Sequence, residues 1–393
     1  MSQPKRSWFL FSMMLIAANL RLPITLMPPL LPSLEKTLHL PSSLAGLLTS
    51  IPLVTFAIFS PIIVKLAHRW GNERTVFTLF LLLIAGSYLR IIPTIAALFI
   101  GTFLVGIGAD SGNVLVPALI KEHVPDQIQL GTSLYTLSML LVGALGTAAA
   151  GYLISHVSFG LTQGLLGLLS IVAALAWLPN LRGRRSTTLT AEQRAAKPHY
   201  QSVWHQRSGW LITLFFGLQS LVYYVLLTWL PSILTAHGVS TIVASNLLTL
   251  FQLSGLPLAF LVPYLYNRRH GLTTLLAIMT LGYVVAPLAF LVPTQSLVFL
   301  ATMALISGLG SGVAFNLSIM FFTEKTTNPY QTAAISGMAQ SAGYLLAAVG
   351  PILFGFLEET THSWAPVIGL LVVFALALTL TGIVVQHHGT IAD

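Results

Sequence analysis

The sequence contains twelve long apolar runs that are separated by short polar segments. An α-helix needs about 20 apolar residues to cross the hydrocarbon core of a bilayer, and each run is roughly that long. The runs do not alternate between polar and apolar residues as barrel strands do, and a helix satisfies its own backbone groups in lipid. We therefore predict an all-α membrane protein with twelve transmembrane helices, at approximately residues 8–31, 43–65, 75–93, 95–119, 130–154, 160–180, 208–231, 242–266, 272–292, 296–321, 332–356 and 364–385.

The composition agrees with a membrane location. Hydrophobic residues make up 55% of the 393 residues and charged residues only 7%, whereas a soluble domain has about 25% charged residues. The absence of cysteine excludes disulfides and thiolate metal sites. The net charge of +8 needs no nucleic-acid partner, because most basic residues fall in cytoplasmic segments if both termini are cytoplasmic. The sequence thus predicts an orientation as well as a number of spans.

The longest polar segment, residues 181–207, divides the spans into six and six. We predict an N-terminal bundle over residues 1–180, a cytoplasmic linker over 181–207 and a C-terminal bundle over 208–393. The basic cluster of the linker is more consistent with a topology signal and a contact to anionic lipid than with a nucleic-acid site.

The two halves repeat one another. Arg69-Trp70-Gly71 is echoed by Arg269-His270-Gly271, and Gly143 and Gly343 share the same offset of 200. Such a repeat predicts two pseudo-symmetric six-helix bundles related by an axis along the membrane normal, with a substrate site between them at mid-depth.

The loop after the second span carries a recognisable motif. It reads from Val64 to Arg74, and Arg69, Gly71 and Arg74 match the signature between helices 2 and 3 of the major facilitator superfamily, which the loop resembles. His68 stands where that signature has an acid. The resemblance implies a conformational gate: the glycine permits a tight turn and the arginines bond helix ends.

A closer resemblance covers nearly the whole chain. Asn19-Leu20-Arg21 with Pro29-Leu30-Leu31-Pro32, Thr228-Trp229-Leu230-Pro231 and Gly308-Leu309-Gly310 are similar to the cyanate and 2-nitroimidazole transporter branch of that superfamily. The resemblance implies the twelve-helix major facilitator fold and a monomeric transporter of the bacterial cytoplasmic membrane that works by alternating access.

Arg21 is the strongest candidate for a functional residue, because it lies near the middle of the first apolar run. A guanidinium at this depth costs roughly 2.5–3.5 kcal/mol on insertion scales. One interpretation is a clamp for an anionic or polar group of the substrate, since arginine stays protonated and offers a planar fork of donors. The other is a structural arginine tied to helix ends or backbone carbonyls.

Asp110 is the acidic residue that the predicted spans place inside the membrane. A carboxylate in this position is a candidate proton carrier or counter-ion. The alternative is a static bond to Arg21 or to a helix end. Both interpretations stay open at this point.

Several other polar residues of the spans are candidates to bind the substrate. They carry amide or hydroxyl groups that can hydrogen-bond a small compound, but they can equally hold helices together. They are Asn19, Asn113, Gln219, Tyr223, Tyr224, Gln252, Asn316, Gln340 and Tyr344.

These observations together predict a secondary active transporter, coupled to protons, for a small anionic or polar compound such as cyanate or a small organic anion. The alternative within transport is a proton-driven exporter of nitroimidazole-like or drug-like compounds. We expect no enzyme, because paired catalytic groups are missing from the spans, and no cofactor or metal site. A membrane sensor would normally add a soluble signalling domain.

Overall fold

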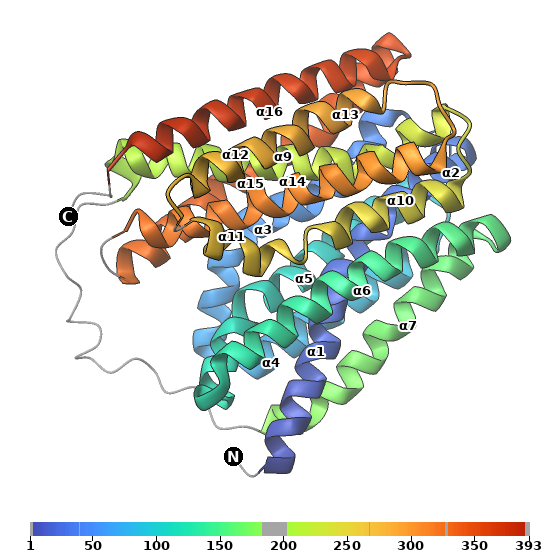
Figure 1. Cartoon of the computed structure of the whole chain (residues 1–393). Coiled ribbons are helices and arrows are strands. Elements are labelled where there is room, and N and C mark those ends of the chain that lie inside the picture. The colour runs from blue at the N-terminus through green and yellow to red at the C-terminus, as the bar shows by residue number, and fades with distance from the viewer. Residues whose placement is uncertain (1–2, 39, 183–202, 267, 327–328, 390–393) are drawn as a thin grey trace. The chain divides into compact units, whose positions relative to one another are not determined.

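The computed structural model describes residues 3–38, 40–182, 203–266, 268–326 and 329–389 (Figure 1). Within these ranges the chain forms helices and no strand, so the all-α prediction is confirmed. The elements are α1 (Gln3–Thr25), α2 (Met27–Leu38), α3 (Ser42–Trp70), α4 (Asn72–Leu89), α5 (Ile95–His123), η1 (Pro125–Gln127), α6 (Ile128–His156), α7 (Phe159–Trp177), η2 (Leu178–Arg182), η3 (Val203–His205), α9 (Arg207–Ala236), α10 (Thr241–Ser254), α11 (Leu258–Tyr266), α12 (Gly271–Thr280), η4 (Leu281–Val285), α13 (Ala286–Ala289), α14 (Leu297–Glu324), α15 (Pro329–Thr361) and α16 (Trp364–His387).

The helices account for the apolar runs. Among the described residues, eleven helical stretches are long and apolar enough to cross a membrane. The third run of the sequence corresponds to α4, which has 18 residues and carries Glu73 in its first turn. The eleven stretches and α4 together match the twelve predicted spans.

The chain forms two compact units. Unit 1 comprises Met1–Leu30 and Val54–His199, and unit 2 comprises Leu31–Leu53 and Tyr200–Asp393. The end of α2 and the start of α3 therefore group with the C-terminal helices. The reason is close packing within unit 2, where a β-carbon on Gly46 of α3 would lie 2.2 Å from the backbone oxygen of Pro351 in α15. Most of the predicted linker, residues 183–202, lies outside the described residues.

Unit 1 is built around α1, which packs against α5, α6 and α7, while α4 lies along α5. Glycines let the backbones of α4 and α5 approach closely: a β-carbon on Gly86 would lie 2.4 Å from the oxygen of Gly101. Small residues at helix interfaces are how membrane helices pack without a hydrophobic driving force between them. This packing fixes the positions of the polar side chains of α1, α5 and α6.

The first span is broken between α1 and α2 at Leu26. Pro28 and Pro29 lack backbone N–H groups, so a continuous helix could not bond the carbonyl of Thr25 in the usual way. The hydroxyl of Thr147 in α6 donates to that carbonyl at 3.1 Å instead. The break is therefore compensated by a neighbouring helix, as membrane helices require.

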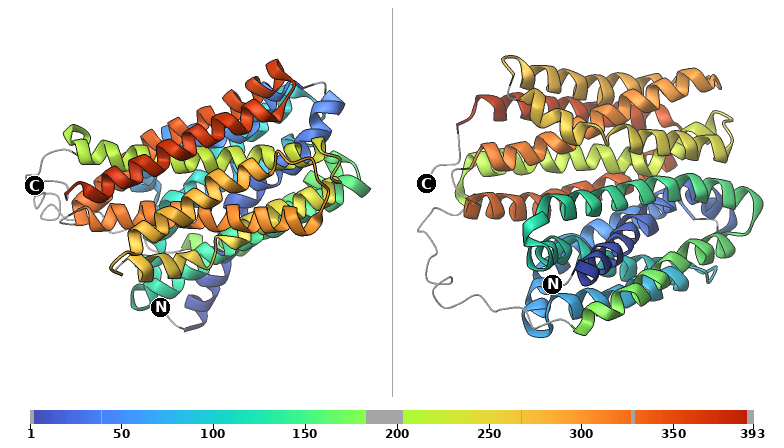
Figure 2. Two further views of the ribbon diagram at one scale, coloured as in Figure 1. Left: turned by 45° about the horizontal axis from the view of Figure 1, so that its top comes forward. Right: turned by 60° about the horizontal axis from the view of Figure 1, so that its bottom comes forward.

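Unit 2 is centred on α9, which packs against α15 and α16, and α14 packs against α10, α11 and α12. The two further views show the long helices of this unit lying alongside one another (Figure 2). Its spans are interrupted at Gly255–Pro257 and by the π-helical turn η4. At η4, a β-carbon on Gly282 would lie 2.6 Å from the Cα of Gly310 in α14, so the backbones nearly touch.

Candidate functional site

Arg21 lies near the C-terminal end of α1, in the middle of the apolar stretch Arg6–Lys36, and is partly exposed. Its aliphatic stem packs on α6, where a β-carbon on Gly143 would lie 3.0 Å from Cγ of Arg21. The next turn of α1 is fastened to the same glycine, because the hydroxyl of Thr25 donates to the carbonyl of Gly143 at 2.9 Å. Gly143 thus makes room for the arginine stem, and α1 and α6 together set the direction of the guanidinium.

Two neutral polar side chains, Tyr135 and Asn113, lie in the same region as Arg21. The hydroxyl of Tyr135 in α6 donates to Oδ1 of Asn113 in α5 at 3.2 Å. The charge of Arg21 acts electrostatically on the buried hydroxyl of Tyr135. Arg21, Tyr135 and Asn113 therefore bring one cation and a hydroxyl–amide pair together in unit 1. Tyr135 was not singled out by the sequence, because a tyrosine in an apolar span is equally typical of packing.

Asn19 has a different role in the structure. It is 1% exposed, and its Nδ2 donates to the carbonyl of Leu15 at 2.8 Å and to that of Leu169 in α7 at 3.3 Å. Both N–H groups of the amide therefore face backbone oxygens. This geometry links α1 to α7.

Asp110 in α5 is 2% exposed. Its partner is Ser60 of α3, whose Oγ lies 2.9 Å from Oδ1 and 3.0 Å from Oδ2. The same Oγ lies 2.6 Å from the carbonyl oxygen of Phe56. The ion pairs among described residues are Arg6–Asp126 and His123–Glu73, so the suggested Asp110–Arg21 bond is not formed. Asp110 is bound to a hydroxyl rather than to a cation.

The candidates of unit 2 gather around aromatic rings. Tyr223 of α9 stacks on Phe251 of α10 with ring centroids 5.8 Å apart, and its edge meets Tyr224 at 5.2 Å. Gln219, one turn before Tyr223, is buried and donates to the hydroxyl of Ser220 at 2.7 Å. Gln252, beside Phe251, is partly exposed and donates to the carbonyl of Leu248.

The remaining candidates lie on α14 and α15. Asn316 is partly exposed and donates to the carbonyl of Gly312 at 2.8 Å. Gln340 is exposed and donates to the hydroxyl of Ser336 at 3.0 Å. Tyr344 meets the ring of Phe216 edge-on at 5.3 Å. Unit 2 therefore offers aromatic faces and amides, whereas the candidate cation Arg21 lies in unit 1.

The turn between α3 and α4 contains Gly71. Gly71 has a φ of +87°, a conformation that residues with a β-carbon rarely adopt. Arg69 and Arg74 are exposed. The buried contact is instead made by Glu73, whose Oε1 lies 2.8 Å from Nε2 of His123 at the end of α5. The Glu73–His123 pair joins the start of α4 to the end of α5. The motif of this unit has His68 in place of its usual acid.

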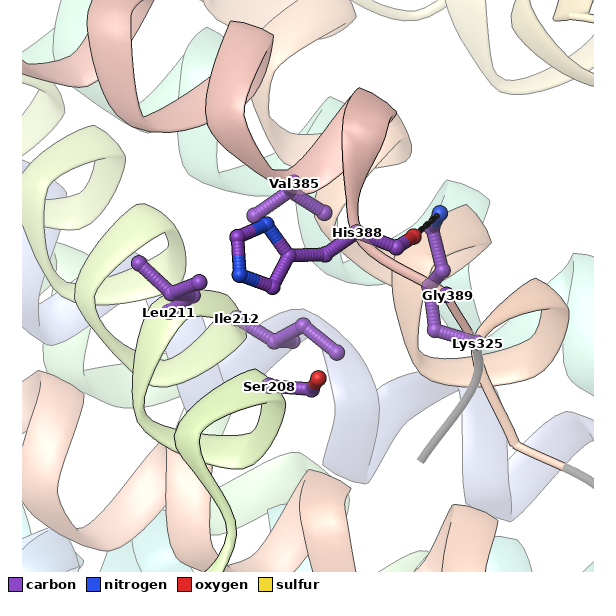
Figure 3. A pocket seen from close by; sticks show the side chains of 7 residues that line it. All are labelled: Ser208, Leu211, Ile212, Lys325, Val385, His388 and Gly389. Atoms are coloured by element: carbon purple, nitrogen blue, oxygen red, sulfur yellow. Dashed lines mark hydrogen bonds between the residues drawn. The ribbon is translucent and has the colours of Figure 1, made fainter. Parts of the chain in front are cut away.

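A hollow at one end of unit 2 is lined mainly by apolar groups (Figure 3). Lys325, at the end of α14, donates from Nζ to the backbone carbonyl of His388. Burial lowers the pKa of the Lys325 ammonium. The lysine thus fastens the end of α16, and the imidazole of His388 lies among Val385, Leu211 and Ile212 (Figure 3). Among the described residues, no cluster of three His, Asp or Glu side chains is arranged to hold a metal ion.

Comparison with known proteins decides the family. The sequence pattern of the Major Facilitator Superfamily matches residues 9–351. The chain belongs to the major facilitator superfamily. Solved structures of this fold superpose well: a bacterial homologue of the human lysosomal transporter Spinster has a TM-score of 0.81 at 16% identity and covers 98% of both chains. A D-xylose–proton symporter has a TM-score of 0.77 at 13% identity, over 97% of this chain and 98% of its own.

Relatives within the superfamily confirm the predicted branch. The 2-nitroimidazole transporter of Escherichia coli is 35% identical over 98% of this chain and 96% of its own. The cyanate transport protein CynX of the same organism is 27% identical over 90% of this chain and 91% of its own. The uncharacterized transporter YycB of Bacillus subtilis is 37% identical over 95% and 92%. The chain is thus a multi-pass membrane transporter with the major facilitator fold, and not an enzyme.

Proposed function

We propose that this major facilitator protein is a secondary active transporter that moves a small anionic or polar compound across the bacterial cytoplasmic membrane by alternating access. The observation that carries the proposal is Arg21, a cation in the middle of the first apolar span, Arg6–Lys36, whose stem is held against Gly143. Arginine stays protonated in any protein environment and presents planar donors that match carboxylate-like groups. Both termini are expected to be cytoplasmic, with the protein acting as a monomer.

The neighbours of Arg21 support an anionic or polar substrate. Tyr135 and Asn113 can donate and accept hydrogen bonds without adding charge. Asp110, the acid of the neighbouring helix α5, is bonded to Ser60, and we assign a charged or polar group of the substrate as a partner of the Arg21 guanidinium during transport. A charged hydrogen bond of this kind is worth about 1.5–3 kcal/mol.

We assign proton coupling to Asp110 because the Ser60 hydroxyl has one hydrogen and two possible acceptors for it. That hydrogen can point to Phe56 or to the carboxylate, and both acceptors are within hydrogen-bond distance. If it points to Phe56, the hydrogen between Ser60 and Asp110 must belong to a protonated carboxyl group; if Asp110 is ionised, Ser60 must turn and donate to it. The pair therefore has a defined hydrogen-bond arrangement for each protonation state.

A second candidate function is proton-driven export of nitroimidazole-like compounds. The observation that favours it is the aromatic cluster of unit 2, where Tyr223 stacks on Phe251 and Tyr344 meets Phe216. Flat rings bind well between such faces. The 35% identity to a 2-nitroimidazole transporter points in the same direction.

The deciding experiment is transport into and out of liposomes that contain the purified protein, under imposed pH and voltage gradients. Cyanate, 4-hydroxybenzoate and 2-nitroimidazole are the test compounds. Arg21→Gln should lower transport of the anions roughly 10-fold or more, which is the loss of one charged hydrogen bond, and Arg21→Lys should recover part of it. Arg269→Gln, which removes an exposed arginine, is the control.

Unchanged anion transport by Arg21→Gln would overturn the role of Arg21. Transport of 2-nitroimidazole alone, insensitive to Arg21→Gln, would favour the second function. Transport of none of the compounds under either gradient, by protein that remains folded, would contradict both substrate classes.

A further inference from the structure

Arg90, at the C-terminal end of α4, is fully buried in unit 1. Its Nη1 donates to the backbone carbonyl of Pro23 at 2.7 Å. Its Nε and Nη2 are buried as well and have no hydrogen-bond partner. A guanidinium has five N–H donors and does not lose its proton. One backbone carbonyl therefore satisfies only a small part of this group.

The charge of Arg90 also lacks a counter-ion among the described residues. The ion pairs found there join Arg6 to Asp126 and His123 to Glu73, and Asp110 is bonded to Ser60. A buried charge without a partner is strongly unfavourable. In a membrane bundle, such a group indicates a functional site with a partner of opposite charge.

A second buried polar group without a hydrogen-bond partner, the hydroxyl of Ser87, lies on the same face of α4. Ser87 precedes Arg90 by three residues, a spacing that places two side chains next to each other on a helix. Ser87 is 4% exposed and its Oγ has no hydrogen-bond partner. Behind them, a β-carbon on Gly101 of α5 would lie 2.9 Å from Cγ of Arg90, so α5 supports the arginine stem. The unused donors are therefore grouped and held in place.

We propose that Arg90 and Ser87 form an anion site in unit 1, separate from Arg21, which binds a small monovalent anion. Nη1 stays on the carbonyl of Pro23, while Nε, Nη2 and the serine hydroxyl donate to the anion. The anion is either chloride or the transported compound, because each would present a single negative charge to the same donors.

The position of the site relates it to the broken first span. Pro23 follows Arg21 by two residues, which is about 3 Å of helix rise, so the two cations act on successive parts of α1. The break at Leu26 follows Pro23, whose carbonyl accepts from Arg90, by three residues. Movement at this break, where Pro28 and Pro29 remove backbone hydrogen bonds, is the step that makes room for the anion.

The test is thermal unfolding of the purified full-length protein in detergent, with sodium chloride, sodium nitrate or sodium cyanate replacing sodium gluconate at constant ionic strength. A ligand of the folded state raises Tm by mass action. We expect a saturable rise in Tm for the wild type, no such rise for Arg90→Gln and an apparent affinity roughly 10-fold lower for Ser87→Ala, the loss of about 1.4 kcal/mol. Arg269→Gln, which removes an exposed charge, should respond like the wild type.

The Arg21→Gln variant separates this site from the proposed substrate clamp. A response that persists in Arg21→Gln and disappears in Arg90→Gln supports the site whatever the transport assay shows. A response that disappears only in Arg21→Gln, or no response of the wild type to any of the three anions, overturns it. If Arg90→Gln does not fold, Ser87→Ala decides, because it keeps the charge; an unchanged affinity in that variant contradicts the proposal. Equal responses to chloride and nitrate indicate a general anion site, and a response to cyanate alone indicates a station for the substrate.

Discussion

Unit 1 and unit 2 repeat one another in sequence but bury different chemistry. The buried charged side chains of the described residues are Glu73, Arg90 and Asp110, and all three lie in unit 1. The buried polar side chains of unit 2 that belong to its C-terminal helices are hydroxyls and one amide, that of Gln219. The candidate tyrosines of unit 2 lie against other rings, Tyr223 stacked on Phe251 and Tyr344 edge-on to Phe216. Under the proposed function, unit 1 binds the charged group of the substrate and unit 2 binds its flat or apolar part.

The repeat is preserved in packing rather than in chemistry. Gly143 and Gly343, at an offset of 200, both sit where another helix approaches closely. Gly143 makes room for Arg21 and Thr25 of α1, whereas Gly343 meets Phe216 and Gly217 of α9. The same small residue thus serves a polar contact in one half and an apolar contact in the other, because a glycine fixes only the distance between helices.

The largest effect is expected from the acid of unit 1. Asp110→Asn keeps the size of the side chain but cannot exchange a proton, so proton-driven accumulation in liposomes should fall about 10-fold or more. Exchange of substrate without a gradient should survive. Ser60→Ala removes the hydroxyl partner and should shift the pH at which accumulation is half-maximal.

A matched substitution in unit 2 sharpens this result. Gln252→Leu removes a neutral amide that donates to the backbone carbonyl of Leu248, and it should leave the pH profile unchanged. If Asp110→Asn still accumulated substrate to the wild-type level, the carboxyl group of Asp110 would not carry the coupling proton.

The next effect concerns the glycines that end the matching turns of the two units. Gly271 has no room for a β-carbon, which would lie 1.7 Å from the oxygen of Leu265. Gly71 has room, with the nearest atom at 3.9 Å, but a φ of +87°. Gly271→Ala should therefore lower the free energy of unfolding by about 1–3 kcal/mol, as overpacking does. Gly71→Ala should lower it by about 1 kcal/mol through backbone strain.

Thermal unfolding of both variants measures the difference. A larger loss for Gly71→Ala than for Gly271→Ala would reverse the comparison and show that the backbone of the second turn adapts.

The smallest effect is expected from the aromatic face of unit 2. Tyr223→Leu removes the ring that stacks on Phe251, and an aromatic pair is worth about 0.5–1.5 kcal/mol beyond its burial. The apparent affinity for 4-hydroxybenzoate or 2-nitroimidazole should fall roughly 2- to 10-fold, and that for cyanate should stay unchanged. Equal losses for cyanate and the aromatic compounds would argue against a division of labour between the units.

The candidate site could be predicted from the sequence only in part. Arg21 and Asp110 stand out because a charge inside an apolar run is rare and expensive. Tyr135, Ser60 and Ser87 carry no such signal, since hydroxyl side chains are common in membrane helices. Arg90 follows the end of α4, where a basic residue is typical of a helix end, and nothing local indicates that it is fully buried.

The sequence by itself determined the membrane location, the number of helical runs, the repeat and the family, because apolar length, charge distribution and motifs are local or additive properties of the chain. Only the tertiary structure decided which polar groups meet. Ser60 and Asp110 are 50 residues apart, and Arg90 and Pro23 are 67 apart. Such pairs depend on how helices pack and where prolines break them, so the partner of each buried charge became visible only once α1, α3, α4 and α5 were in place.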